Sequence, residues 1–158
     1  MSDAELLRRL LRIQDQLLLD GERASKLSLS KSKRLRGDAV VNPFTGSICF
    51  AADLRGASDR VLTCVLAHEL GHREDMLYRA LCWSLPLYLV GLLTVGLHHQ
   101  LAALVVFVPL CAAFLNFTFQ HRERRADENA VRRLKLVGSR VDYWQADAEY
   151  QSQFGNGK

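Results

Sequence analysis

The sequence has few of the residues that build disulfide frameworks or cysteine metal sites. Its four cysteines, Cys49, Cys64, Cys82 and Cys111, never occur as a C-x-x-C pair. This pattern is typical of a reducing compartment and predicts neither disulfide bonds nor a cysteine-bound zinc. The N-terminus also lacks a basic segment followed by an apolar core, so we expect no cleavable signal peptide.

Charge is unevenly distributed along the 158 residues, a length that suits one modest domain. No basic stripe with interleaved aromatic residues occurs, so the sequence gives no indication of nucleic-acid binding. Residues 77–119 contain no charged side chain apart from Arg79. The remainder is basic, which suits contact with an anionic membrane face.

The uncharged region divides into two apolar stretches, 77–97 and 101–119, each close in length to the roughly 20 residues that span a bilayer. Only residues 98–100 separate them, which predicts a tight hairpin. Arginines flank the hairpin but are missing from its loop, so the positive-inside rule places both outer ends in the cytosol. We therefore predict a multi-pass protein of the cell (inner) membrane, in contact with the lipid bilayer, with cytoplasmic termini. The alternative is a helical hairpin buried within protein.

A metal-binding motif precedes this region. His68, Glu69 and His72 form H-E-x-x-H within an apolar run that we expect to be helical. Because residues four apart share a helix face, the two imidazoles can bind one zinc ion. Glu69 is then placed to act as a general base on a water molecule. Since a catalytic zinc has three protein ligands, a third ligand must come from elsewhere in the chain.

The third ligand is expected directly after the second apolar stretch. Glu123 and Asp127 are again four apart, on one face of a predicted helix. An antiparallel hairpin returns the chain to the level that it left, so Glu123 should arrive beside His72. We predict that Glu123 ligates zinc and that Asp127 accepts the outer N–H of a ligating histidine. The alternative is that Glu123, within an arginine-rich run, is an ion-paired surface residue.

Other elements are expected around these motifs. The apolar spacing of residues 2–20 predicts an amphipathic helix that begins with a capping box of Ser2 and Glu5. This helix would either pack on the domain or lie on a membrane surface. Residues 40–41 and 48–50 predict a β-hairpin around a turn at 42–46, with its second strand extending over 47–54. Ser58 is expected to cap the helix that carries His68. After residue 141 we expect a short final helix and then a disordered tail over residues 152–158.

The second strand of this hairpin is the predicted substrate-binding segment. An exposed strand edge beside a zinc site can bind an extended peptide as a further strand. The predicted residues are Ser47, Ile48, Cys49, Phe50, Ala51 and Ala52. A purely structural hairpin accounts for these residues equally well.

The two motifs together resemble a known family. H-E-L-G-H at 68–72 followed by E-R-R-A-D-x-x-A at 123–130 is similar to the HtpX and CAAX-prenyl-protease family of integral-membrane zinc metallopeptidases, which are gluzincins. The stretch from Asn42 to Leu54 also resembles the segment before the family's first motif. The resemblance covers about residues 40–136. His68, His72 and Glu123 match the family's zinc ligands. Glu69 matches its general base and Asp127 its supporting acid.

The resemblance implies an α+β membrane protein. A mainly helical gluzincin-like catalytic domain with a small β-hairpin would carry a two-helix transmembrane hairpin between its zinc motifs, and one zinc ion per chain. The family usually has two further spans before the catalytic domain, whereas none is expected here, and we expect much of the family's usual substrate cleft to be missing. His121, Arg132 and Tyr143 are the candidates for stabilising the oxyanion.

The predicted function is a membrane-embedded zinc metalloendopeptidase with its active site at the cytosolic face. Its partners would be peptide or protein substrates, unfolded or membrane-associated, as in membrane-protein quality control. One alternative is a catalytically idle, zinc-stabilised membrane regulator or binding protein, although a structural zinc has no need of Glu69. Another is a signalling peptidase with one dedicated partner. The sequence does not indicate an oligomeric state.

Overall fold

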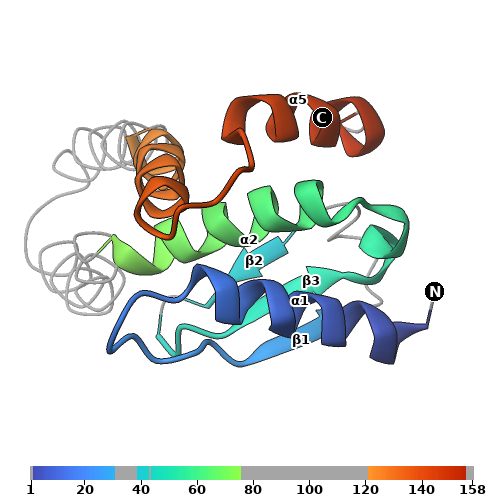
Figure 1. The fold of residues 1–158 in the computed structure, drawn as a ribbon. Helices are drawn as coiled ribbons and strands as arrows, with labels where there is room; N and C mark the ends of the chain where they lie inside the picture. The colour runs from blue at the N-terminus through green and yellow to red at the C-terminus, as the bar shows by residue number, and fades with distance from the viewer. Residues whose placement is uncertain (1, 31–38, 43, 76–120, 156–158) are drawn as a thin grey trace, which may run out of the picture.

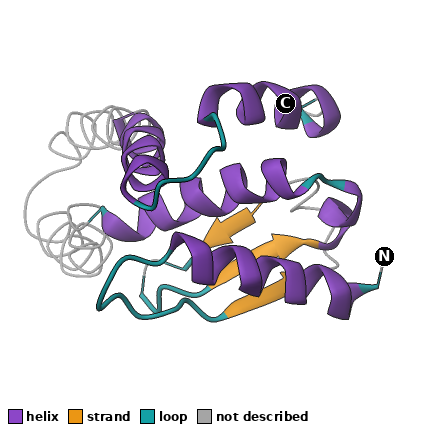
Figure 2. Cartoon of the chain, in the orientation of Figure 1, coloured by secondary structure: helices purple, strands orange, loops and turns teal. Residues whose placement is uncertain are grey.

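The computed structural model describes residues 2–30, 39–42, 44–75 and 121–155. In these residues, helices pack on a three-stranded sheet (Figure 2). The elements in chain order are α1 (Asp3–Leu17), β1 (Leu27–Ser30), β2 (Ala39–Val41), β3 (Ile48–Ala51), the 3-10 helix η2 (Ala52–Gly56), α2 (Asp59–Glu74) and α5 (Tyr143–Phe154). Residues 121–136 are also helical.

The predicted N-terminal helix is confirmed as α1. The Ser2 side chain accepts a hydrogen bond from the backbone N–H of Glu5 at 3.2 Å, which caps the first turn. The apolar stripe of α1 is buried and consists of Leu6, Leu10, Ile13 and Leu17. Because α1 contacts α2 and β1, this stripe packs on the domain, and the helix ends at Leu17 rather than reaching residue 20.

The predicted hairpin is confirmed, but its second strand is shorter than expected. β2 pairs antiparallel with β3, with Val40 opposite Cys49. In the turn, the Asn42 side chain accepts hydrogen bonds from two backbone N–H groups, and Gly46 has a φ of 68°, which favours glycine. The strand ends at Ala51 because the chain then turns into η2.

A third strand completes the sheet. β1 pairs parallel with the other side of β3, which gives the order β1–β3–β2. The middle strand is therefore β3, and in the part of the chain that the structure describes β2 lies at one edge. β2 contacts α2, so this edge runs beside the helix that carries the H-E-x-x-H motif.

Helix α2 lies between two layers. The sheet is on one side, and the helical residues 121–136 and α5 are on the other (Figure 1). Ser58 caps α2 by accepting a hydrogen bond from the N–H of Val61, as predicted. Ten of the 16 residues of α2 are buried, which is the pattern of a helix covered on more than one side.

The helical residues 121–136 approach α2 closely at Gly71. A Cβ atom at Gly71 would lie only 2.4 Å from the backbone oxygen of Ala126. The side chain of Asn129 donates a hydrogen bond to the Gly71 carbonyl at 3.2 Å. Small residues at this crossing therefore set the distance between the two helices that carry the predicted metal ligands.

A buried ion network fixes the other end of these helical residues. The guanidinium of Arg133 is 1% exposed and donates to Glu22, to Glu74 at the end of α2 and to the carbonyl of Leu17. Glu22 also pairs with Arg73. Helix α1, helix α2 and residues 121–136 are thus joined through one arginine.

The C-terminal helix is longer than predicted. α5 begins at Tyr143, where Asp142 accepts a hydrogen bond from the N–H of Gln145 at 3.1 Å. It packs on α2 through the buried Ala146 and continues to Phe154. The predicted tail over residues 152–158 is therefore helical at its start. Residues 156–158 lie outside the described residues.

The prediction of a membrane protein is corrected by the structure. Among the described residues, no helix is long and apolar enough to cross a bilayer. This finding contradicts both the predicted α+β membrane fold with a transmembrane hairpin and the predicted multi-pass location. The two predicted spans, 77–97 and 101–119, lie outside the described residues. The prediction rested on apolar composition, which does not by itself distinguish a span from a helix buried within protein.

Candidate metal centre

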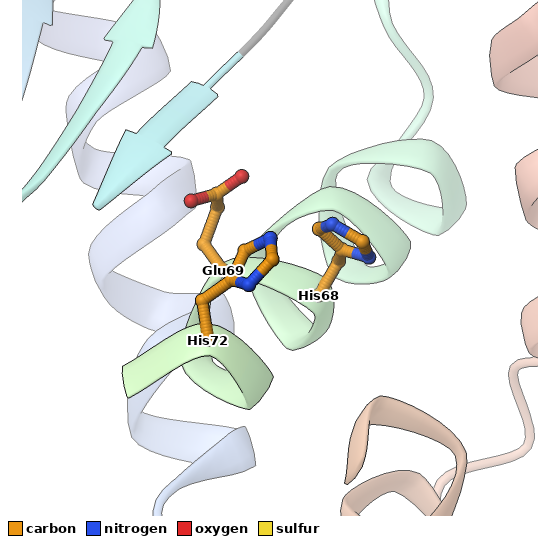
Figure 3. Close-up of side chains that lie close together, drawn as sticks. All are labelled: His68, Glu69 and His72. Carbon is orange, nitrogen blue, oxygen red and sulfur yellow. The ribbon is translucent and has the colours of Figure 1, made fainter. Parts of the chain in front are cut away.

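The residues of the H-E-x-x-H motif lie together in the second half of α2. The rings of His68 and His72 are side by side, with centroids 4.6 Å apart, while the carboxylate of Glu69 extends toward β2 (Figure 3). The candidate ligand atoms of these three residues all lie within 4.8 Å of one another. This group can therefore hold a metal ion.

Glu123 approaches both histidines from the neighbouring helical residues 121–136. Its Oε2 atom lies 3.3 Å from Nε2 of His68 and 3.5 Å from Nε2 of His72. One carboxylate oxygen thus faces two imidazole nitrogens, which is the arrangement of a two-histidine, one-carboxylate donor set. Two nitrogens and one carboxylate oxygen fit the preferences of zinc and leave room for a further ligand.

Asp127 and Tyr143 contact the other nitrogen of His68. Oδ1 of Asp127 lies 2.8 Å from Nδ1 of His68, and the Tyr143 hydroxyl donates to the same Oδ1 at 2.5 Å. A carboxylate at Nδ1 fixes the ring so that Nε2 faces Glu123. Tyr143 comes from α5, so the third helix of this region also reaches the site.

The electrostatics of His68 reflect its two carboxylate neighbours. Burial alone would lower the pKa of His68, but the hydrogen bonds to Asp127 and Glu123 outweigh it and raise this pKa to about 10. The hydrogen bonds to His68 and His72 hold the pKa of Glu123 well below its usual range. Both carboxylates are therefore ionised near neutral pH and can attract a cation.

His72 has a different environment. Burial lowers its pKa, and the nearby positive charges of His68 and Arg122 act in the same direction. Nε of Arg122 donates to Nδ1 of His72 at 3.2 Å, so a neutral His72 carries its own proton on Nε2, facing Glu123. A metal ion at Nε2 would take the place of that proton. Sequence reasoning missed this contact of Arg122, because a residue beside a predicted ligand gives no signal of its own.

The three oxyanion candidates are placed very differently. Tyr143 lines the pocket, but its hydroxyl is held by Asp127 and lies 3.1 Å from Nδ1 of His68. Arg132 pairs with Glu74, the last residue of α2, at 3.2 Å and is not among the described residues that line the pocket. His121 is exposed and is not among the described residues that line the pocket. The geometry therefore gives Tyr143 a role in supporting His68.

A pocket of about 430 Å³ opens over the motif. Its described walls come from β2, α2, residues 121–136 and α5, with Ala39, Val40 and Val41 of β2 beside His68, Glu69 and His72.

The predicted substrate-binding residues 47–52 are not among those that line this pocket. They belong mainly to β3, which is paired on both sides and has no free edge for a further strand. Among the described residues, the expected free edge therefore lies on the neighbouring strand β2, which runs beside the site. A substrate-binding role of residues 47–52 stays a prediction. A hairpin pattern alone does not show which of its two strands will be central, because β1 joins β3 from a distant part of the sequence.

No protein-family model, no curated protein and no solved structure matches the chain. The resemblance to the HtpX and CAAX-prenyl-protease family therefore rests only on the residues of the two motifs and of the stretch from Asn42 to Leu54.

Proposed function

We propose that this chain is a zinc-dependent peptidase. The observation that carries the proposal is the position of Glu123, whose Oε2 lies 3.3 Å and 3.5 Å from the Nε2 atoms of His68 and His72. These three residues would hold the ion. Glu69 lies next to them in a pocket and is directed to the side where β2 runs. A site that only stores a metal has no need of this additional carboxylate.

Such an ion, when bound, polarises a carbonyl group and makes a water molecule more acidic. Glu69 then accepts the proton of the attacking water and passes it to the amine that leaves. Its side chain is 5% exposed, which limits exchange of that proton with bulk solvent. Asp127 and Tyr143 keep the ring of His68 in place during this proton transfer.

The substrate is proposed to bind as an extended segment along β2. Val40 is 48% exposed, whereas its neighbours Ala39 and Val41 are buried, so β2 presents one outward side chain. In the sheet formed by the described residues, β2 is also an edge strand. A peptide that pairs with this edge would pass over His68 and Glu69, which line the same pocket. Pairing through backbone groups suits an unfolded protein, because any sequence provides them.

The test is cleavage of casein, an unfolded protein, by the purified full chain loaded with zinc. The expected result is cleavage by the wild type that is abolished by a chelator and restored by zinc. Glu69→Gln keeps the size of the side chain and should lose activity by a factor of at least about 100, since general-base catalysis contributes 10²–10⁴-fold. Glu149→Gln on α5 is the matched control, because Glu149 contacts Ser58 and Gln153 away from the site.

The same test distinguishes the proposed peptidase from the main alternative, a peptide-binding regulator. A chain that binds zinc and an extended peptide, but leaves casein and short peptides intact, would be a peptide-binding regulator rather than an enzyme. The edge position of β2 favours binding in either case. Equal activity of the wild type and Glu69→Gln would show that any observed cleavage comes from a contaminant.

A further inference from the structure

One carboxylate in the pocket has no part in the proposed chemistry. The described lining contains four acidic residues: Glu69, Glu123, Asp127 and Asp147. Glu123 faces the two histidines, Asp127 supports His68, and Glu69 is the proposed base. Asp147 is partly buried, and it has no hydrogen bond or ion pair within the described residues.

The position of Asp147 on α5 is distinctive. It lies one turn after Tyr143 and one turn before Tyr150 and Gln151, and all four residues line the pocket. In Figure 1, α5 and β2 lie on opposite sides of α2. The wall that a peptide on β2 would face therefore carries a carboxylate between two tyrosines. Aromatic rings beside a carboxylate suit a cationic side chain.

The charge of the described lining leads to the same conclusion. A divalent ion would neutralise two of the four negative charges, and Arg122, the one lysine or arginine in this lining, would neutralise a third. One negative charge remains in the pocket. A neutral or acidic peptide side chain would bury Asp147 further without a partner, which is costly, whereas a basic side chain would pair with it.

The offset between Asp147 and the metal ligands can be expressed as a number of substrate residues. Cys64 of α2 and Asp147 of α5 line the same pocket, and the two helices pack against each other. Burial raises the pKa of the Cys64 thiol, and the charge of Asp147 adds to this effect, as expected of neighbouring groups. Cys64 precedes His68 by four residues of α2, about 6 Å along the helix. Since an extended peptide advances about 3.3 Å per residue, this offset corresponds to about two residues.

We propose that Asp147 is a specificity-determining residue that selects peptides with lysine or arginine within two residues of the bond to be cut. The inference rests on the proposed peptidase function and names its substrate class. The basic side chain lies between the rings of Tyr143 and Tyr150 and pairs with the carboxylate. A basic residue farther along the substrate lies outside the reach of Asp147.

The test uses internally quenched peptides that are identical except for lysine, norleucine or glutamate at each position flanking one bond. With the zinc-loaded wild type, kcat/KM should be about 10-fold higher for lysine than for norleucine at one position, which is the size expected of a charged hydrogen bond. Asp147→Asn should remove this preference and leave the norleucine peptide within about 2-fold. Asp147→Lys should favour glutamate instead. Glu149→Gln, two residues along the same helix, should keep the lysine preference.

Binding of the same peptides to Glu69→Gln, followed by fluorescence anisotropy, gives a second readout that needs no turnover. A lysine preference in binding without cleavage by the wild type would support the role of Asp147 and contradict the peptidase. Cleavage by the wild type with no charge preference would overturn the role of Asp147 alone. A preference that persists in Asp147→Asn would also overturn it.

Discussion

The hydroxyl of Tyr143 donates to Oδ1 of Asp127 at 2.5 Å, and the same oxygen lies 2.8 Å from Nδ1 of His68. One carboxylate oxygen thus connects a residue of α5 to a candidate metal ligand on α2. Burial, followed by the hydrogen bond to Asp127 and the charge of Asp127, holds the pKa of Tyr143 above its usual range, so the hydroxyl stays protonated and keeps donating. Tyr143 therefore restricts the orientation of Asp127.

We predict that Tyr143→Phe weakens zinc binding by about 10-fold, because outer residues of metal sites typically contribute 10–100-fold to affinity. The substitution keeps the buried ring and removes only the hydroxyl. Zinc affinity is measured by competition with a chromophoric chelator. Tyr150→Phe, on the same face of α5, is the control and should change affinity by less than about 2-fold. Unchanged affinity in Tyr143→Phe would contradict this role.

Zinc content should separate the ligands from the base. His68→Ala and Glu123→Ala each remove one donor and should lower the bound zinc to well below one ion per chain after dialysis. Glu69→Gln should retain it. Inductively coupled plasma mass spectrometry of the dialysed proteins measures the ratio. Glu128→Ala, an exposed neighbour paired with Arg124, is the control for Glu123. Full zinc content in both ligand variants would refute the proposed donor set.

Gly71→Ala should disturb both stability and the site. The added Cβ would lie 2.4 Å from a backbone oxygen of Ala126, which cannot rotate away as a side chain can. We expect a loss of about 2 kcal/mol in the free energy of unfolding in urea, together with weaker zinc binding, because residues 121–136 must move away from α2. Gly56→Ala is the control, since no atom lies within 4 Å of the position that its Cβ would take. Equal effects of the two substitutions would argue against the close crossing.

Arg133→Met should destabilise the fold strongly. Arg133 is 1% exposed, and its loss leaves Glu22 and Glu74 without their shared partner. Removing one member of a buried ion pair typically costs about 3–5 kcal/mol, which urea unfolding would show. Arg124→Met breaks an exposed pair with Glu128 and should cost less than about 1 kcal/mol. A small loss of unfolding free energy in Arg133→Met would contradict this prediction and would mean that water readily takes the place of the guanidinium.

The same network predicts a pH dependence. Burial alone would raise the pKa of Glu22, but hydrogen bonds from Arg133 and the N–H of Leu19 lower it from 4.5 to about 2. Because the pKa is lower in the folded state, ionised Glu22 stabilises the fold above pH 4.5, and this contribution is lost as the pH falls toward 2. The difference in unfolding free energy between wild type and Glu22→Gln should therefore narrow as the pH is lowered from about 5 to about 3. A constant difference would contradict the lowered pKa.

The local elements were predictable because each is encoded by neighbouring residues. Ser2 and Ser58 cap the helices that follow them, and Asn42 with Gly46 forms the turn of the hairpin. Spacing also indicated that His68 and His72 share one helix face. These features depend on contacts within a few residues, which a sequence shows directly.

Contacts between distant segments were harder to predict. The sequence did not show that β1 pairs with β3, so it gave the edge position to the wrong strand of the hairpin. It gave Tyr143 as one of three candidates for stabilising the oxyanion and did not indicate that its hydroxyl contacts Asp127, because the direction of α5 follows from packing against α2. The apolar content of residues 77–119 suggested membrane spans. Among the described residues, no helix is long and apolar enough to be one.

The candidate donors come from two parts of the chain that are far apart in sequence. His68 and His72 become neighbours as soon as α2 forms, whereas Glu123 lies about fifty residues after His72. An ion held by all three would cross-link the chain and close a long loop, which limits the conformations of the unfolded state much as a disulfide does. Completing the donor set would then be a late event in folding, because it needs a contact between residues far apart in sequence. The rate of ion uptake would therefore measure how fast residues 121–136 pack on α2.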